Sequence, residues 1–324
     1  MKFSVAIVVL TIGCQMLRGD DVVTRGQREL GIGINEGSIG FDKAFPAAQR
    51  SGMQFVELPQ QWDEIEPKPG KFTNQWLDIA NAYYPQVGVK LSISLNPIDT
   101  NSLRLPADLK GKPLDHPDVI ARYTKAVDYV LGRLSNTTLV AFSIGNEIDG
   151  FLGSDPAKWA QYERFFKATA QHVRRKKPGV PVGTKVMLPS ATGDLRRQVQ
   201  AVNQHADAVF VTYYPLKGDF SVKPPTIVHD DIGAVAKLYD GKPVYFLEIG
   251  YPSSPDLGSS EKRQAEFVKE VFKAWDRHNA QVRAMNFIWL HDISTAEINT
   301  YKQYYRLNAR GFGEYLGTLG LRTH

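Results

Sequence analysis

The chain has 324 residues, of which 43% are hydrophobic and 23% are charged, and its formal net charge is +5. These proportions are those of a globular protein, so they exclude a collagen-like chain, wholesale disorder and a protein with many membrane spans. The single cysteine, Cys14, excludes a disulfide scaffold and a cysteine-rich zinc or iron–sulfur module. No long basic block is interleaved with aromatic residues, so we expect no nucleic-acid partner.

The first twenty residues have the pattern of an export signal. The basic start Met1-Lys2 precedes an almost continuously apolar run, Phe3 to Ile12, which is too short to span a bilayer. We therefore predict a signal peptide over 1–20 and a secreted protein, either periplasmic or extracellular. The sequence Thr-Ile-Gly-Cys ending at Cys14 also resembles a bacterial lipobox, so a membrane-anchored lipoprotein is the alternative.

From residue 21 onward, short apolar runs alternate with helical patterns, and no linker divides the chain. Most of the runs are rich in β-branched or aromatic residues, as buried parallel strands are. The predicted strands cover 31–35, 55–58, 91–96, 140–144, 182–188, 209–213, 244–249 and 284–290. Eight strands that alternate with helices predict a single α/β domain over 21–324, a (β/α)8 TIM barrel. A doubly wound sheet is the alternative, but no glycine-rich nucleotide motif follows the first strand.

Three of the predicted helices have clear boundary signals. Asp115-His116-Pro117 precedes a stretch whose apolar residues follow a spacing of three or four. A helix over 163–177 ends in four cations before Pro178-Gly179, which suits the helix dipole. Ser259-Ser260-Glu261 begins the third helix.

Active sites of such barrels are built at the C-terminal ends of the strands. The fourth predicted strand is followed by Asn146-Glu147, and the seventh carries Glu248 near its end. Either glutamate alone could be a cap or an ion-pair partner. Two carboxyl groups converging on one pocket, however, are what glycosidic cleavage requires: one protonated to donate to the leaving oxygen, the other ionised to attack the anomeric carbon.

With further motifs, these residues make the chain resemble the clan A glycoside hydrolases, a group of retaining (β/α)8 enzymes. Asn146-Glu147 and Glu248 match the acid/base and nucleophile positions of that group. Tyr213-Tyr214-Pro215 matches a strand-six aromatic that hydrogen-bonds the nucleophile, and Trp289 matches a strand-eight residue that floors the sugar site. The stretch Trp-Asp-Glu-Ile-Glu-Pro beginning at Trp62 resembles a segment that follows strand two in several of these enzymes.

Within the clan, the Tyr-Tyr-Pro sequence and the Glu-Ile-Gly-Tyr-Pro sequence at Glu248 are similar to family-53 endo-β-1,4-galactanases. Two positions depart from the clan pattern. Glu57 lies where many members have an arginine, and Asn96 lies on strand three, where many have a histidine. Glu57 is either a pocket residue or the partner of a nearby base. The resemblance implies a retaining β-glycosidase, endo-acting or an unclassified member of the clan.

The implied mechanism is double displacement. Glu248 attacks the anomeric carbon, and Glu147 protonates the departing oxygen and then activates water. Asn146 would hydrogen-bond the sugar 2-hydroxyl. The other residues expected to bind substrate are Tyr213, Trp289, Asn96 and Trp62. For Tyr213 and Trp289 the alternative is packing in the barrel. Trp62 is expected at the rim, beside neighbouring subsites, and the alternative that it contacts no substrate is equally open.

We expect no cofactor and no metal, because the seven histidines are scattered without ligand spacing. The expected partner is an oligo- or polysaccharide, bound by a monomer. Two other functions stay open: a noncatalytic carbohydrate-binding barrel, favoured by the departures at Glu57 and Asn96, and a transglycosylase that uses the same carboxylates. Residues 317–324 resemble an interrupted closing segment, so we expect either a truncated chain or a short last helix.

Overall fold

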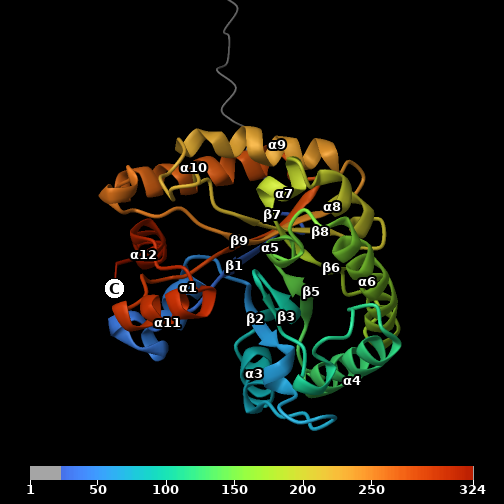
Figure 1. Cartoon of the computed structure of the whole chain (residues 1–324). Coiled ribbons are helices and arrows are strands. Elements are labelled where there is room, and N and C mark those ends of the chain that lie inside the picture. Colours follow the sequence, from blue (N-terminus) through green and yellow to red (C-terminus); the bar gives the residue numbers. More distant parts are fainter. Residues whose placement is uncertain (1–22, 324) are drawn as a thin grey trace, which may run out of the picture.

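The computed structural model describes residues 23–323, so the predicted leader over 1–20 and the lipid site at Cys14 lie outside the described residues. Strands and helices alternate along this part of the chain (Figure 1). The strands are β1 (Glu29–Ile32), β2 (Phe55–Gln61), β3 (Lys90–Asp99), β4 (Ser102–Leu103), β5 (Leu139–Asn146), β6 (Val182–Gly183), β7 (Lys185–Met187), β8 (Val209–Tyr213), β9 (Val244–Ile249) and β10 (Val282–Phe287). The helices are α1 (Phe41–Arg50), α2 (Trp62–Ile65), α3 (Gln75–Gln86), α4 (Pro117–Arg133), α5 (Asp149–Leu152), α6 (Pro156–Lys176), α7 (Leu188–Thr192), α8 (Arg196–Asn203), α9 (Val228–Leu238), α10 (Glu261–Arg277), α11 (Thr295–Tyr305) and α12 (Arg310–Gly317).

The parallel strands close into a ring. Their order is β6-β5-β3-β2-β1-β10-β9-β8-β7, and the short β4 pairs antiparallel with β3. Although β6 and β7 stand at the two ends of this order, they are consecutive pieces of one strand that is interrupted only at Thr184. The chain itself therefore joins the two edges, and the predicted (β/α)8 TIM barrel is confirmed, with a strand in each of the eight predicted runs.

Capping residues set the boundaries of the outer helices. α4 begins at Pro117 and α10 at Glu261, where Ser260 is the N-cap, as predicted. α6 begins at Pro156, seven residues before the predicted start, because the Asp155 side chain accepts hydrogen bonds from the first free backbone N–H groups. None of the helices within residues 23–323 is long and apolar enough to cross a membrane.

The inside of the barrel has two layers, an apolar layer and, nearer the C-terminal ends of the strands, a polar layer. The apolar layer is a separate cluster that comes almost entirely from strands: Phe55, Val140, Ala141, Ala208, Phe210, Tyr245, Leu247 and Ala284. Side chains two positions further along a strand share the same face. Two positions after Phe55, Ala141, Phe210 and Ala284 come Glu57, Ser143, Thr212 and Asn286. The polar layer therefore lies at the C-terminal ends of the strands.

An irregularity in β9 turns Glu248 into this polar layer. Val211 and Thr212 are consecutive on β8, but their partners on β9 are Phe246 and Glu248, so Leu247 is an extra residue. A β-bulge of this kind bends its strand and redirects the next side chain. Leu247 consequently joins the apolar layer, and Glu248 still faces inward beside it.

Candidate active site

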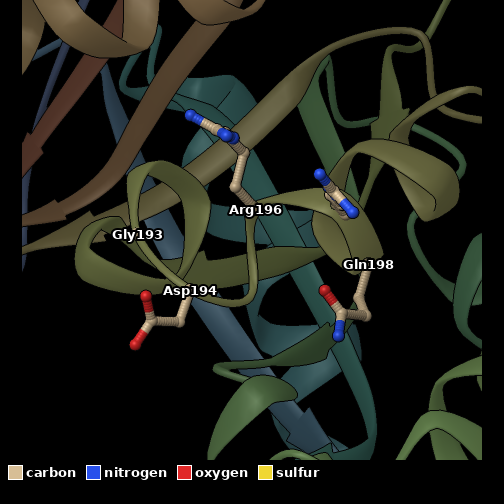
Figure 2. A pocket seen from close by; sticks show the side chains of 5 residues that line it. Gly193, Asp194, Arg196 and Gln198 are labelled. Carbon is tan, nitrogen blue, oxygen red and sulfur yellow. The ribbon is translucent and has the colours of Figure 1, made fainter.

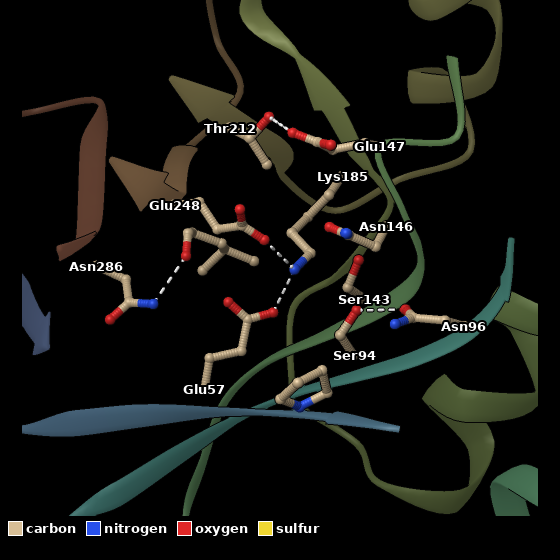
Figure 3. A network of polar contacts seen from close by, with 12 residues as sticks. Glu57, Ser94, Asn96, Ser143, Asn146, Glu147, Lys185, Thr212, Glu248 and Asn286 are labelled. Atoms are coloured by element: carbon tan, nitrogen blue, oxygen red, sulfur yellow. Dashed lines mark hydrogen bonds and ion pairs between the residues drawn. The ribbon is translucent and has the colours of Figure 1, made fainter. Parts of the chain in front are cut away.

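Glu147 and Glu248 enter one polar network from different strands (Figure 3). Glu147 directly follows β5, and Glu248 lies on β9. The two carboxyl groups are close enough that the charge of Glu248 raises the pKa of Glu147. The fold thus brings together the pair that the sequence singled out.

Glu147 is held by two hydroxyl groups in a largely buried position. Thr212 Oγ1 donates to its Oε1 at 2.7 Å, and Thr100 Oγ1 donates to its Oε2 at 2.9 Å. Burial raises the pKa of Glu147 most, the charge of Glu248 adds to the rise and the hydroxyl donors oppose it, which leaves the pKa at about 8. A carboxyl group with this pKa keeps its proton at neutral pH, as a general acid must.

Glu248 has partners that favour its ionised form. Lys185 Nζ donates to Oε1 at 3.0 Å, and the Tyr214 hydroxyl donates to Oε2 at 2.9 Å. The Lys185 side chain is only 2% exposed, so water screens its charge weakly. A charged donor and a hydroxyl donor on one carboxylate stabilise the negative charge that a nucleophile needs. The environments of the two glutamates therefore differ in the way that an acid and a nucleophile require.

Lys185 is shared with a second carboxylate, since its Nζ also lies 2.5 Å from Glu57 Oε1. Burial by itself lowers the pKa of Lys185, but the charges of Glu57 and Glu248 outweigh burial and raise that pKa. For Glu57, burial raises the pKa, the attraction of Lys185 opposes the rise and the charge of Glu248 adds to it, giving about 7. Of the two alternatives for Glu57, the structure thus shows the ion-pair partner.

Asn146 presents an unused acceptor at the site. Its Nδ2 donates to Asp99 Oδ1 at 2.8 Å, whereas its Oδ1 is buried and has no hydrogen-bond partner among the described residues. Asp99 fixes this orientation, because it also accepts from Gln61 Nε2 at 2.8 Å and from the Tyr304 hydroxyl. Leaving such an oxygen unpaired costs about 1–3 kcal/mol, which a ligand hydroxyl would recover.

Tyr213, predicted to contact substrate, points out of the barrel. Because Thr212 faces inward, its neighbour Tyr213 faces outward, and the Tyr213 hydroxyl donates to Asp231 of α9 at 2.7 Å. Tyr214 makes the hydrogen bond to Glu248 that the Tyr-Tyr-Pro motif implied. Of the two tyrosines in the motif, Tyr214 therefore contacts Glu248, and Tyr213 does not face the site where it was predicted to contact substrate.

Trp62 also lies away from the carboxylates. Its side chain is fully buried, its Nε1 donates to Glu66 Oε2 at 2.9 Å, and its ring packs edge-on against Tyr123. Trp62 therefore packs in the interior, and the prediction that it lies at the rim and contacts substrate is wrong.

The remaining two residues predicted to bind substrate differ in burial: Asn96 is 1% exposed, and Trp289 is half-buried. Asn96, on β3, accepts a hydrogen bond from Ser94 at 2.6 Å, and its buried Nδ2 has no partner among the described residues. Trp289 follows β10 and is half-buried, with its ring centroid 5.8 Å from that of Tyr301.

Backbone strain is concentrated around these residues. Five non-glycine residues in the described part of the chain have a positive φ, and three of them are Thr100 (50°), Glu147 (42°) and Trp289 (68°). Such a conformation costs of order 1–3 kcal/mol and is found mainly at functional sites, where the surrounding structure enforces it. The strain supports a site at the ends of β3, β5 and β10.

Helices α11 and α12 extend across the mouth of the barrel, and Figure 1 shows them in red, next to each other. On one side, Tyr304 donates to Asp99 at the end of β3, and Asn101 Nδ2 donates to the Tyr305 carbonyl at 3.0 Å. On the other side, the Tyr315 ring packs 5.4 Å from that of Tyr214, which follows β8. Burial raises the pKa of Tyr315 well above its ordinary value, and the charges of Glu147 and Glu248 add to the rise. The two helices therefore form an aromatic cover beside both carboxylates.

A surface hollow of about 410 Å³ lies elsewhere, on the connection between α7 and α8 (Figure 2). It is lined by Gly193, Asp194, Arg196, Arg197 and Gln198, and it includes neither carboxylate. Within residues 23–323, no three His, Cys, Asp or Glu side chains are arranged to hold a metal ion.

Several residues of the site escaped the sequence analysis: Thr100, Asp99, Lys185 and Thr212. Lys185 had a visible signal, because it is the one cation in the apolar run 182–188. A lone charge in a buried strand requires a partner, so it marks a polar interior.

No protein-family profile matches the sequence, and no curated protein matches it. Solved structures do match its fold. A GH5_18 variant from Streptomyces cattleya in complex with Manβ1-4GlcNAc has a TM-score of 0.66 at 16% identity, covering 91% of this chain and 76% of that one. An exo-β-1,4-mannosidase from Opitutaceae bacterium strain TAV5 has 0.68 at 16%, covering 91% and 56%. The GH53 catalytic domain of Ignisphaera aggregans has 0.60 at 16%, covering 81% and 79%. The predicted resemblance to clan A glycoside hydrolases is thereby confirmed at the level of the fold.

Proposed function

We propose that the protein is a retaining glycoside hydrolase that cleaves β-linked glycans, with Glu147 as acid/base and Glu248 as nucleophile. In the first step Glu248 attacks the anomeric carbon, the bond to the leaving oxygen breaks, and Glu147 gives that oxygen its proton. In the second step Glu147 takes a proton from water, which displaces Glu248 from the sugar.

One observation carries the proposal: two converging carboxyl groups have opposite environments. Glu147 is buried among hydroxyl groups, with a pKa of about 8, and Glu248 contacts a buried cation. A binding site needs no such contrast, because sugars are neutral. Asn146 Oδ1, a buried acceptor without a partner among the described residues, supports a contact with the sugar 2-hydroxyl. Trp289 offers an aromatic face to the same sugar.

The test is a panel of 4-nitrophenyl β-D-glycosides and β-glycans that includes β-mannosides, since a solved neighbour is in complex with Manβ1-4GlcNAc. Wild type is compared with Glu147→Gln, Glu248→Gln and the control Glu266→Gln, whose side chain is exposed on α10. We expect turnover by wild type and Glu266→Gln, and a loss of at least about a thousandfold in Glu248→Gln, because the attacking group is gone. Equal turnover in wild type and Glu248→Gln would refute the assignment.

Two other outcomes separate the rival functions. Glycan affinity without turnover in wild type would identify a noncatalytic carbohydrate-binding barrel. Longer products at high acceptor concentration would identify a transglycosylase, in which a sugar hydroxyl replaces water in the second step. The ¹H NMR signal of the first-formed product tests retention, because the anomeric configuration is kept only after two displacements.

We further propose that the protein is exported, on the basis of the apolar run in the leader over 1–20. Expression in a bacterial host with fractionation tests this, and intact mass distinguishes simple cleavage from a lipid on Cys14. A full-length, cytosolic product would contradict it.

A further inference from the structure

The barrel interior contains a charged pair, Lys185 and Glu57, that forms no bond and transfers no proton in the proposed mechanism. Lys185 lies on β7 and Glu57 on β2, so the pair crosses the barrel, and Figure 3 shows Lys185 between Glu57 and Glu248. The Lys185 side chain is 2% exposed and that of Glu57 is 9% exposed. The Nζ atom lies 2.5 Å from Glu57 and 3.0 Å from Glu248.

A buried ion pair is a poor source of stability, because the cost of desolvating both charges offsets most of their attraction. An apolar pair of similar volume would fill the same space at least as well. Lys185 also pairs with Glu248, and this contact suggests a role for the cation. Glu248 must be ionised before it can attack, and a nearby positive charge favours that form.

We propose that Lys185, which also pairs with Glu57, is a positioning residue that holds the Glu248 carboxylate ionised and oriented. This inference rests on the proposed function, since it assigns the charge of Glu248 to catalysis. Lys185 contacts one oxygen of Glu248 and Tyr214 the other, so both oxygens are fixed.

The remaining titratable groups around Glu248 do not replace the cation. They are carboxyl and phenol groups: Glu57, Glu147, Tyr214, Tyr301, Tyr305 and Tyr315.

The test is the pH profile of kcat/KM with 2,4-dinitrophenyl β-D-glycosides, whose leaving group needs no acid, so that the acidic limb reports the ionisation of the nucleophile. In Lys185→Met we expect that limb to move to higher pH by about one to three units, the usual effect of an adjacent opposite charge. In Lys185→Arg the limb should stay within about half a unit of wild type, even if kcat falls, because the charge remains.

Glu57→Gln is the matched control, because it breaks the same buried pair but leaves Lys185 facing Glu248. Its acidic limb should not move to higher pH. If Lys185→Met does not fold, the double variant Lys185→Met with Glu57→Gln removes both charges and should show the same upward shift. The inference is overturned if the limb of Lys185→Met stays in place, or if Glu57→Gln shifts upward as far as Lys185→Met. The proposed function fails separately, if Glu248→Gln keeps wild-type activity.

Discussion

Replacing Thr212 by valine tests which neighbouring groups set the pKa of Glu147. The Thr212 hydroxyl donates to Glu147 Oε1 at 2.7 Å and so favours the ionised carboxylate. Valine keeps the size of the side chain but has no hydroxyl, so the pKa of Glu147 should rise above its present value of about 8. A hydrogen bond to a charged group contributes about 1.5–3 kcal/mol. Since one pKa unit is 1.36 kcal/mol, the expected shift is about one to two units.

The assay is kcat/KM from pH 5 to 10 with a phenyl β-glycoside, whose poor leaving group requires the acid. The alkaline limb of this profile reports the acid in the free enzyme. It should lie near pH 8 in wild type and higher in Thr212→Val. Thr124→Val is the control, because the Thr124 hydroxyl bonds only to its own helix, α4, on an exposed face. An alkaline limb that stays in place or moves to lower pH in Thr212→Val would refute the reasoning.

Three further predictions concern the same site. Tyr214→Phe removes a hydrogen bond to Glu248 and should lower kcat/KM by about ten- to a hundredfold. Tyr213→Phe loses a bond to Asp231, so it should lower the melting temperature and leave kcat/KM near wild type. Equal losses of kcat/KM in both variants would contradict the assignment. The pKa of Glu147 rises from 4.5 to about 8 in the fold, so its contribution to stability is complete below pH 4.5 and is lost as the pH rises through 8. Glu147→Gln should therefore melt about 3 °C or more above wild type at pH 9, with the gap closing toward pH 4.5, as measured by calorimetry. Because α11 and α12 cover the mouth, chain ends should be cleaved before chain interiors; a drop in polymer viscosity that precedes monosaccharide release would contradict this.

The strands could be predicted because each one is a short apolar run between turn signals. The structure differs mainly at their ends: β3 and β5 are longer than their apolar runs, and the fifth predicted strand is interrupted at Thr184. These differences depend on pairing with neighbouring strands, which local sequence does not specify. The interruption matters, because it lets one half of the strand pair with β5 and the other half with β8.

The convergence of Glu147 and Glu248 could be predicted because parallel strands present their C-terminal ends on one rim. Whether Tyr213 or Tyr214 contacts Glu248 could not be predicted, because it depends on which face of β8 points inward. Lys185 reaches partners 128 and 63 residues away, and Tyr304 reaches Asp99 across 205 residues, so their roles follow only from the order of strands around the ring. For Trp62 the sequence prediction was wrong. The motif match suggested a position at the rim, but the fold buries this side chain.

The central claim is that Glu248 forms a covalent bond with the sugar. It is tested most directly by incubating wild type with 2,4-dinitrophenyl 2-deoxy-2-fluoro-β-D-glycosides, which react in the first step and hydrolyse slowly in the second. Peptide mass spectrometry should then find one fluorosugar per chain, attached to Glu248, and none in Glu248→Gln. A sugar attached to another residue, or continued turnover without any attached sugar, would contradict the account.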